Sequence, residues 1–456
     1  MATTIVTVND LVDKSRVTRY MVRIYLLCVM VLLLDGFDVM AIGLAAPGIA
    51  QTLHLNPKAL GVVFGCSQLG ALLGALVFGP VADRFGRKRT LVSCACMFGV
   101  LTLATPLVGS VTQLALLRIV TGLGLGGGVP NAVAIASEYS PRRLRSTLTA
   151  AIWSGFPFGG VVLGVASAYL LGRFGWQSIF IVGGIVPLLV AATVALWLPE
   201  SMAFLVGHGK NPLQLRRIAA RFEPSLQDRQ DVEFQTVEKK VTGMPVKHLF
   251  LGGLTGTTLL IWVTFYLSSV ALIFLVFWTP TLFRMVGATA AQASIALSFF
   301  NIGSVLATIV IGRLMQRNPY IALRYTFACS AVAVLLFGLL AQRMPYAIVA
   351  GMVLLMGLLV CGANSGLMAL SAISYPAGVR SSGVGWGYGI GKIGSITGPM
   401  MGGLLIARKV DLPYICASMA LTGVLAAISI TVLKRHTERR AMAQAEVQVE
   451  AAAQAG

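Results

Sequence analysis

Apolar stretches long enough to cross a lipid bilayer recur along this 456-residue chain. A transmembrane helix needs about 20 largely apolar residues. Twelve stretches meet this requirement, at about 23–50, 58–82, 90–109, 112–136, 147–171, 177–198, 254–283, 288–312, 320–341, 345–371, 382–407 and 412–433. Only 11% of the residues are charged, against about 25% in an average soluble domain. The sequence therefore excludes a soluble enzyme and a disordered chain, and it predicts an all-α membrane protein.

The longest polar interval falls between the sixth and seventh stretches and divides the predicted spans into six and six. The predicted organisation has five parts: a cytoplasmic N-terminal tail at 1–22, a six-helix bundle at 23–198, a cytoplasmic central loop at 199–253, a second six-helix bundle at 254–433 and a cytoplasmic C-terminal tail at 434–456. No short apolar core precedes a small-residue cleavage site near the N-terminus, so we expect no cleaved signal peptide.

The basic residues are distributed unevenly between the two sides of the membrane. Of the 35 Lys and Arg, six lie on the side opposite the N-terminus, two lie deep within spans, and the other 27 lie on the N-terminal side. Because cytoplasmic loops carry an excess of Lys and Arg, both termini are predicted to be cytoplasmic. This placement also explains the net charge of +19 through anionic lipids and the membrane potential. Membrane lipids are therefore expected partners, and nucleic acid is not.

The two halves of the chain resemble each other. A shift of 235 residues superimposes six pairs of residues: Gly122 and Gly357, Gly127 and Gly362, Pro141 and Pro376, Arg145 and Arg380, Ser146 and Ser381, and Gly159 and Gly394. The fourth and fifth spans thus match the tenth and eleventh. Duplicated halves are typical of secondary transporters, which bind substrate between the halves near the membrane midplane.

A charged, glycine-containing loop joins the second and third predicted spans. It reads Gly79-Pro80-Val81-Ala82-Asp83-Arg84-Phe85-Gly86-Arg87-Lys88-Arg89. This run resembles the G-x-x-x-D-R-x-G-R-[KR] loop of the major facilitator superfamily. The resemblance implies twelve helices in two pseudo-symmetric halves that move by alternating access. An ordinary basic loop would explain the Arg and Lys residues, but it would not explain Asp83 or the glycine spacing.

Charged residues at the predicted cytoplasmic helix ends are candidates for an inner gate. We expect Asp83, Arg87, Glu138 and Arg145 to form a charge cluster that holds this gate shut while the outer gate is open. The alternative interpretation is a set of ordinary solvated loop charges. The sequence Leu198-Pro199-Glu200-Ser201, another element similar to the superfamily, closes the first half.

Two acidic residues, Asp35 and Asp38, lie in the middle of the first predicted span. Their i, i+3 spacing places both carboxylates on one helix face. A charged side chain at the bilayer centre costs about 2.5–3.5 kcal/mol on insertion scales, so these residues are candidates for proton coupling. A hydrogen-bonded pair that braces the bundle is the alternative. The run Asp35-Gly36-Phe37-Asp38, followed by Gly43, Ala46 and Pro47, resembles the aromatic acid:proton symporter family, which imports benzoate- and hydroxybenzoate-type anions with protons.

Two basic residues lie deep in predicted spans, Arg118 in the fourth and Lys392 in the glycine-rich eleventh. Either could bind the carboxylate of a substrate or pair with the acids of the first span, and the sequence leaves both possibilities open. For Lys392, snorkelling of the side chain to the membrane surface is the structural alternative.

Further polar and aromatic residues could line a cavity for an aromatic ligand. They are Gln68, Asn131, Trp153, Trp262, Tyr266, Asn301, Asn364, Trp386 and Tyr388. The seven cysteines and four histidines show no metal-ligand spacing. We therefore expect neither a metal nor a cofactor, with the proton gradient as the energy source.

Three functions remain open. The leading hypothesis is proton-coupled import of a small aromatic carboxylate by a monomeric protein of the bacterial inner membrane. The second is proton-driven efflux of drugs or metabolites, because Gly398-Pro399-x-x-Gly402-Gly403 resembles the glycine-proline run of such antiporters. This run lies in the eleventh span, however, and the fifth span, where antiporters carry it, has the imperfect match Gly155-Phe156-Pro157-Phe158-Gly159-Gly160. The third is a sensor of the same ligands that does not transport them. None of the three is an enzyme.

Overall fold

The computed structural model of the chain describes residues 4–15, 17–208, 212–223, 226, 232–235, 245–251, 253–376 and 379–455. Part of the expected central loop, 199–253, therefore lies outside the described residues. Within them, twelve helical segments are long and apolar enough to cross a membrane. The predicted all-α fold with twelve spans is thus confirmed, and the chain is a multi-pass membrane protein.

Ten of the spans are each formed by one helix: α2 (Arg19–Thr52), α3 (Pro57–Phe85), α5 (Val111–Glu138), α8 (Gln177–Trp197), α11 (Thr255–Met285), α12 (Ala290–Met315), α13 (Pro319–Leu340), α14 (Tyr346–Ser374), α15 (Arg380–Ala407) and α16 (Leu412–Ala455). The other two are interrupted. The third consists of α4 (Arg87–Ala104) and the 3-10 turn η1 (Thr105–Leu107), and the fifth consists of α6 (Arg142–Trp153) and α7 (Gly155–Phe174).

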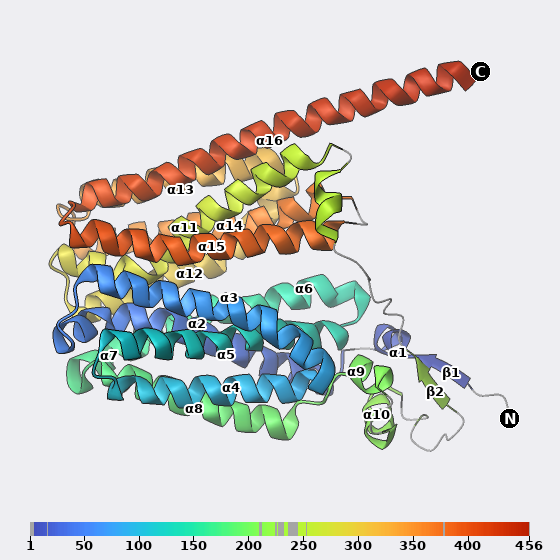
Figure 1. Cartoon of the computed structure of the whole chain (residues 1–456), viewed down its shortest axis with the longest axis horizontal. Helices are drawn as coiled ribbons and strands as arrows, with labels where there is room; N and C mark the ends of the chain where they lie inside the picture. Colours follow the sequence, from blue (N-terminus) through green and yellow to red (C-terminus); the bar gives the residue numbers. More distant parts are fainter. Residues whose placement is uncertain are drawn as a thin grey trace. The chain divides into compact units, whose positions relative to one another are not determined.

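The polar segments contain more regular structure than the sequence predicts. The expected N-terminal tail holds β1 (Thr4–Thr7) and α1 (Val8–Lys14), and the central loop holds α9 (Met202–Gly207), α10 (Pro212–Ala219), β2 (Val232–Gln235) and η3 (Pro245–Phe250). Strands β1 and β2 pair in parallel, with Thr4 opposite Val232 and Thr7 opposite Gln235. The expected C-terminal tail continues α16 as helix (Figure 1).

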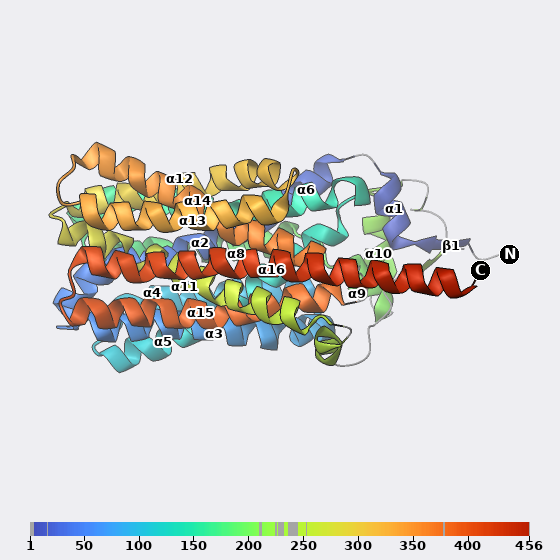
Figure 2. The same ribbon diagram turned by 90° about the horizontal axis from the view of Figure 1, so that it is seen from above.

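By its internal contacts the chain forms two compact units, residues 1–49 with 66–241 and residues 50–65 with 242–456. In the first unit α4 packs against α5 and α8, and the small elements α1, β1, α9 and α10 lie beyond one end of the spans (Figures 1 and 2). In the second unit α11 packs against α15 and α16, and α14 packs against α12 and α13. The sequence did not predict that residues 50–65 belong with the second unit.

Glycines bring the helices of each unit into close contact. In the first unit a Cβ atom on Gly159 of α7 would overlap the Leu33 carbonyl of α2, and in the second a Cβ atom on Gly394 of α15 would overlap the Tyr266 carbonyl of α11. Small residues at such crossings let helix backbones approach each other. Gly159 and Gly394 are related by the 235-residue shift, so the repeat seen in the sequence places equivalent contacts in the two units.

Candidate functional site

A buried ion pair joins α2 and α5 in the first unit. The Asp38 carboxylate lies in the middle of α2, and the Arg118 guanidinium lies in the third turn of α5. Asp38 is 4% and Arg118 is 1% exposed, and Arg118 Nη1 lies 3.4 Å from Asp38 Oδ1. Because an isolated charge in such surroundings is strongly disfavoured, each side chain is the main electrostatic support of the other.

Residues of the third and sixth spans complete the surroundings of this pair. Thr102 Oγ1 donates to Asp38 Oδ1 over 3.4 Å, and Arg118 Nη2 donates to Thr105 Oγ1. The Arg118 guanidinium also lies over the Phe180 ring, with Cζ 5.3 Å from the ring centroid. Arg118 Nε is buried and has no hydrogen-bond partner among the residues that the structure describes. One polar contact of the guanidinium is therefore left unmade, while its other nitrogens are bound.

Asp35, the second acid of α2, lies on the same side of the helix as Asp38. Asp35 is partly buried and lines a small pocket together with Cys94 and Phe98 of α4 and Leu125 of α5. Asp38 faces the same two elements, since its partners Thr102 and Arg118 belong to the third and fourth spans. Both acids of α2 thus lie toward α4 and α5, and Asp38 pairs with Arg118.

Lys392 has a different environment in the second unit. Its side chain is partly buried, and Nζ lies 5.5 Å from the centroid of the Tyr388 ring, one turn earlier on α15. Among the described residues of its own unit, no carboxylate lies within ion-pair distance of Lys392. The ammonium group therefore has an aromatic face beside it and no anionic partner within that unit.

Trp386 lies apart from Lys392 and Tyr388 on α15. Its ring stacks on Trp262 of α11, with centroids 6.0 Å apart and an interplanar angle of 28°. On a helix with 3.6 residues per turn, positions 388 and 392 share a face, whereas position 386 points to another side. The sequence grouped all three residues as substrate candidates, and the structure does not bring Trp386 together with the other two.

The remaining candidates are distributed over several helices. Asn131 and Asn301 are buried and each donates to a carbonyl of its own helix, Gly127 O and Leu297 O, both over 2.8 Å. Asn364 Nδ2 donates to Ser268 Oγ over 3.2 Å, and the Tyr266 hydroxyl accepts from Thr397 Oγ1 over 3.1 Å. Gln68 is buried in α3, whereas Trp153 is 41% exposed at the end of α6.

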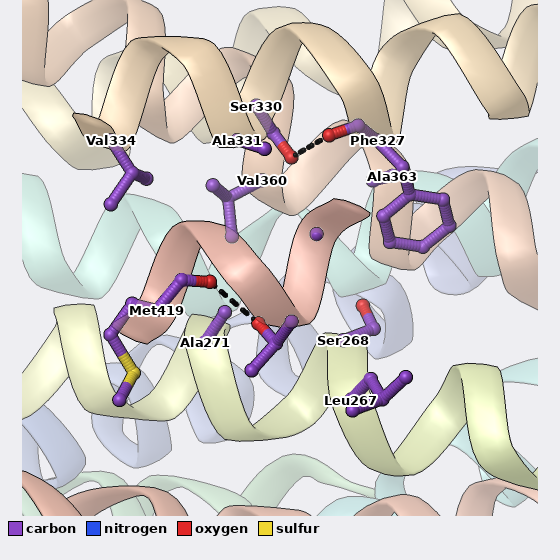
Figure 3. Close-up of a pocket in the computed structure, with 12 residues that line it drawn as sticks. Leu267, Ser268, Ala271, Phe327, Ser330, Ala331, Val334, Val360, Ala363 and Met419 are labelled. Carbon is purple, nitrogen blue, oxygen red and sulfur yellow. Dashed lines mark hydrogen bonds between the residues drawn. The ribbon is translucent and has the colours of Figure 1, made fainter. Parts of the chain in front are cut away.

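A pocket between α11, α13, α14 and α16 offers little to an anion (Figure 3). Its lining is mostly aliphatic, with Phe327 at one side, and it contains no charged residue. Two of its hydroxyl groups donate to carbonyls of their own helices, Ser330 to Phe327 O and Thr422 to Met419 O, both within hydrogen-bond distance. This pocket is therefore a packing gap inside the second unit, without the chemistry to bind a carboxylate.

Part of the expected gate cluster is present at the end of α5. Arg87, at the start of α4, forms an ion pair with Glu138, whose other carboxylate oxygen accepts from Ser201 Oγ over 2.6 Å. Glu200 accepts from the backbone N–H of Lys88 over 2.9 Å. Gly86 has a φ of 105°, and a Cβ atom there would overlap the Glu200 carboxylate, which explains the glycine at this point of the loop.

The other two members of the expected cluster are not joined to it. Arg145 donates from Nη2 to the Ser140 carbonyl over 3.3 Å instead of pairing with Glu138. Asp83 is exposed in the last turn of α3 and has no ion pair among the described residues. The expectation of a four-residue cluster is therefore wrong for these two side chains, because the Arg145 guanidinium binds the Ser140 carbonyl and the Asp83 carboxylate is exposed.

Several contributing residues were not predicted. Thr102, Thr105 and Phe180 surround the ion pair, but threonine and phenylalanine are common in membrane helices and give no signal in a single sequence. Tyr139 is buried and donates to Glu200 O over 2.7 Å. Burial raises the pKa of Tyr139 well above its ordinary value, and the neighbouring Tyr20, Glu138 and Glu200 raise it further, so its hydroxyl stays protonated and can donate.

The family model of the Major Facilitator Superfamily matches residues 28–287 and 284–453. The chain therefore belongs to the major facilitator superfamily, a family of membrane transporters and not of enzymes. Its fold agrees with this assignment. The xylose transporter XylE from E. coli superimposes with a TM-score of 0.69 at 18% identity, over 90% of this chain and 97% of that one.

Relatives with higher identity are transporters of aromatic acids. The 4-hydroxybenzoate transporter PcaK of Pseudomonas putida is 34% identical over 93% of this chain and 95% of its own length. The gallate transporter of Pseudomonas putida is 32% identical over 93% of this chain and 94% of its own length. The resemblance to the aromatic acid:proton symporter family, first inferred from Asp35 to Asp38 and the residues after it, is confirmed.

Proposed function

We propose that this protein imports a small aromatic carboxylate of the benzoate or hydroxybenzoate type together with protons, across the inner membrane of a bacterium. The buried pair of Asp38 and Arg118 carries the proposal, because it places a titratable group inside a membrane span beside a fixed positive charge. The names of the relatives, which include transporters of 4-hydroxybenzoate and gallate, support the substrate class.

Protonation of Asp38 is the proposed coupling step. When the carboxylate takes up a proton, its attraction to Arg118 is lost and the guanidinium becomes an uncompensated buried charge. Breaking such a pair costs about 3–5 kcal/mol. A difference of this size changes the population ratio of two conformations by a factor of roughly a hundred to several thousand, so it biases the conformational equilibrium of a transporter strongly. Asp35, which faces the same helices, is the second proposed proton site.

The substrate carboxylate is proposed to bind Lys392. The guanidinium of Arg118 is already bound to Asp38 and Thr105, whereas the ammonium of Lys392 lies beside the Tyr388 ring and has no carboxylate partner among the described residues of its unit. Tyr388 is 39% exposed and offers a face on which an aromatic ring can stack. A cation and an aromatic surface at one place match the carboxylate and the ring of an aromatic acid. The geometry thus favours Lys392 over Arg118 as the anchor.

The other predicted lining residues keep a proposed supporting role. These are Gln68, Asn131, Trp153, Asn301 and Asn364, with Trp386 less favoured because of its position on α15.

The ion pair of Arg87 and Glu138 is proposed to belong to the inner gate. Ser201, which donates to Glu138, and Glu200, which accepts from the Lys88 N–H, are proposed to stabilise the ends of α5 and α4 there.

Uptake by membrane vesicles tests the function. Vesicles that contain the protein are supplied with labelled 4-hydroxybenzoate, benzoate or gallate, with an imposed inward proton gradient or without one. We expect accumulation of at least one acid only with the gradient, and its loss on addition of an uncoupler. Accumulation that survives loss of the gradient would contradict symport, and gradient-dependent extrusion would favour the efflux alternative.

A further inference from the structure

The N-terminal segment is anchored on the first unit at two levels. Strand β1 pairs with β2 of the central loop, and α1 buries three side chains. Val8 and Val12 join the core formed by α2, α5 and the central-loop helices, whereas Leu11 joins a small cluster with Ala219 and Val232. The segment is thus an ordered part of this unit.

This anchoring places the side chain of Asp13 at the start of α6. Asp13 Oδ1 accepts from the backbone N–H of Arg142 over 2.7 Å, and Asp13 Oδ2 lies 3.0 Å from Arg142 Nε. The neighbouring Ser15 carbonyl lies 3.4 Å from Arg143 Nη2. Three contacts therefore connect the end of α1 to the first two residues of α6, which lie about 130 positions further along the chain.

Helix α6 lacks a cap of its own. The residue before it is Pro141, whose side chain has no polar atom, and its first turn contains no acidic residue. The first N–H groups of a helix need an acceptor, and the positive end of the helix dipole favours a carboxylate. Arg142, Arg143 and Arg145 add positive charge to the first turns of α6, so a carboxylate at this helix end is favoured further. Asp13 supplies both the acceptor and the negative charge.

The far end of α6 leads directly to the α2 site. After Ser154 the span continues as α7, and a Cβ atom on Gly155 would lie 2.8 Å from the Val29 carbonyl of α2. The Phe156 carbonyl lies so close to Gly36 that a Cβ atom there would overlap it. Gly36 is next to Asp35. The position of α6 therefore sets how the α6–α7 junction lies against the segment of α2 that carries the two acids.

We propose that Asp13 is a positioning residue for transport: it caps α6 from the N-terminal segment and thereby fixes the junction of α6 and α7 against α2. It touches neither substrate nor proton site. Its loss should slow the conformational cycle and leave substrate binding unchanged.

Three variants separate the cap from the ion pair. Asp13→Ala removes both, Asp13→Asn keeps an acceptor oxygen for the backbone N–H, and Arg142→Ala keeps the cap but removes the guanidinium. Asparagine is as good an N-cap residue as aspartate. Per molecule of folded protein in vesicles, we expect the maximal uptake rate of labelled 4-hydroxybenzoate to fall about three- to tenfold in Asp13→Ala, with an unchanged half-saturation concentration. Asp13→Asn and Arg142→Ala should stay within about twofold of the parent protein.

An equal loss in all three variants, or a parent-like rate per folded molecule in Asp13→Ala, would overturn the proposal. The rate measurement rests on the proposed function, so a second measurement is independent of transport. Amide hydrogen exchange of the purified full chain should show faster exchange at residues 142–145 in Asp13→Ala than in Asp13→Asn. Equal exchange in these two variants would show that the side chain does not cap α6.

Discussion

The two units share their helix contacts but differ in buried charge. Gly159 of α7 packs on the Leu33 carbonyl of α2, and the repeat-related Gly394 of α15 packs on the Tyr266 carbonyl of α11. These equivalent contacts align Leu33 of α2 with Tyr266 of α11. The same alignment places Ala271 of α11 where α2 has Asp38, and the 235-residue shift places Val353 of α14 where α5 has Arg118. Ala271 is 8% and Val353 is 0% exposed, so the second unit is apolar at the positions of the ion pair.

The buried ion pair, present in the first unit and replaced by apolar residues in the second, indicates which buried residues the fold requires and which serve the function. The second unit packs the corresponding helices with aliphatic side chains, so helix packing of this kind does not require a buried ion pair. Replacing such a pair by apolar residues is often neutral or stabilising in other proteins. The presence of Asp38 and Arg118 is therefore better explained by proton coupling than by bracing of the bundle. The second unit has instead a cation, Lys392, which lies beside the Tyr388 ring and has no carboxylate within ion-pair distance among the described residues of that unit.

The largest effect is expected for Asp38→Asn. The amide cannot bind or release a proton at this site, so gradient-driven accumulation should be lost altogether while the protein remains folded in the membrane. Uptake by vesicles under an imposed proton gradient measures this. As the matched control, Ala271→Ser alters the corresponding position of the second unit and should leave accumulation within about twofold, since a serine hydroxyl can donate to a carbonyl of its own helix. Equal losses in the two variants would remove the distinction between the units.

Removal of the cation alone should destabilise the protein strongly. Arg118→Ala leaves the Asp38 carboxylate buried without its counter-ion, at a cost of about 3–5 kcal/mol. The double variant Asp38→Ala, Arg118→Val gives the first unit the residues of the second, and it should recover most of this loss while remaining unable to couple uptake to protons. Thermal unfolding of the purified proteins measures the stability. A double variant that is as unstable as Arg118→Ala would mean that the pair is part of the framework.

A smaller effect, confined to binding, is expected for Lys392→Ala. A hydrogen bond to a charged group contributes about 1.5–3 kcal/mol, so the affinity for the acid should fall roughly ten- to a hundredfold. The uncharged amide of the same acid should bind weakly to the parent protein and lose little more in the variant. Equilibrium binding of both ligands to the two proteins gives the four values of the cycle. If acid and amide lose affinity equally, Lys392 does not bind the carboxylate.

The smallest effect is expected for Tyr139→Phe at the helix ends of the first unit. This change removes the hydrogen bond to the Glu200 carbonyl and leaves the ring in place, so it should lower stability by about 1 kcal/mol. Because burial raises the pKa of Tyr139, the parent protein should keep this bond between pH 6 and pH 9, and the stability difference from the variant should be constant over that range. Thermal unfolding at several pH values tests this, and a difference that disappears by pH 9 would show that the tyrosine ionises.

Most of the fold could be predicted from the sequence because span length and loop charge are imposed by the bilayer. The twelve spans, the repeat and the family follow from such features, and Asp35, Asp38, Arg118 and Lys392 stand out because charge inside a span is rare. The choice of partners could not be predicted. That Arg118 binds Asp38 depends on the rotation of α5, and that Arg145 turns to Ser140 depends on the geometry of one helix end. The pairing of β1 with β2 joins segments over 220 residues apart, each too short to give a periodic signal.

The central claim is that proton coupling lies in the first unit and can be removed without removing transport. The most direct test compares two kinds of uptake of labelled 4-hydroxybenzoate by vesicles that contain Asp38→Asn. One is driven by an imposed proton gradient, and the other is exchange for unlabelled acid inside the vesicles at equal pH on both sides. We predict that exchange persists and that gradient-driven accumulation is lost. Accumulation at the level of the parent protein in this variant would contradict the assignment of Asp38 as the proton site.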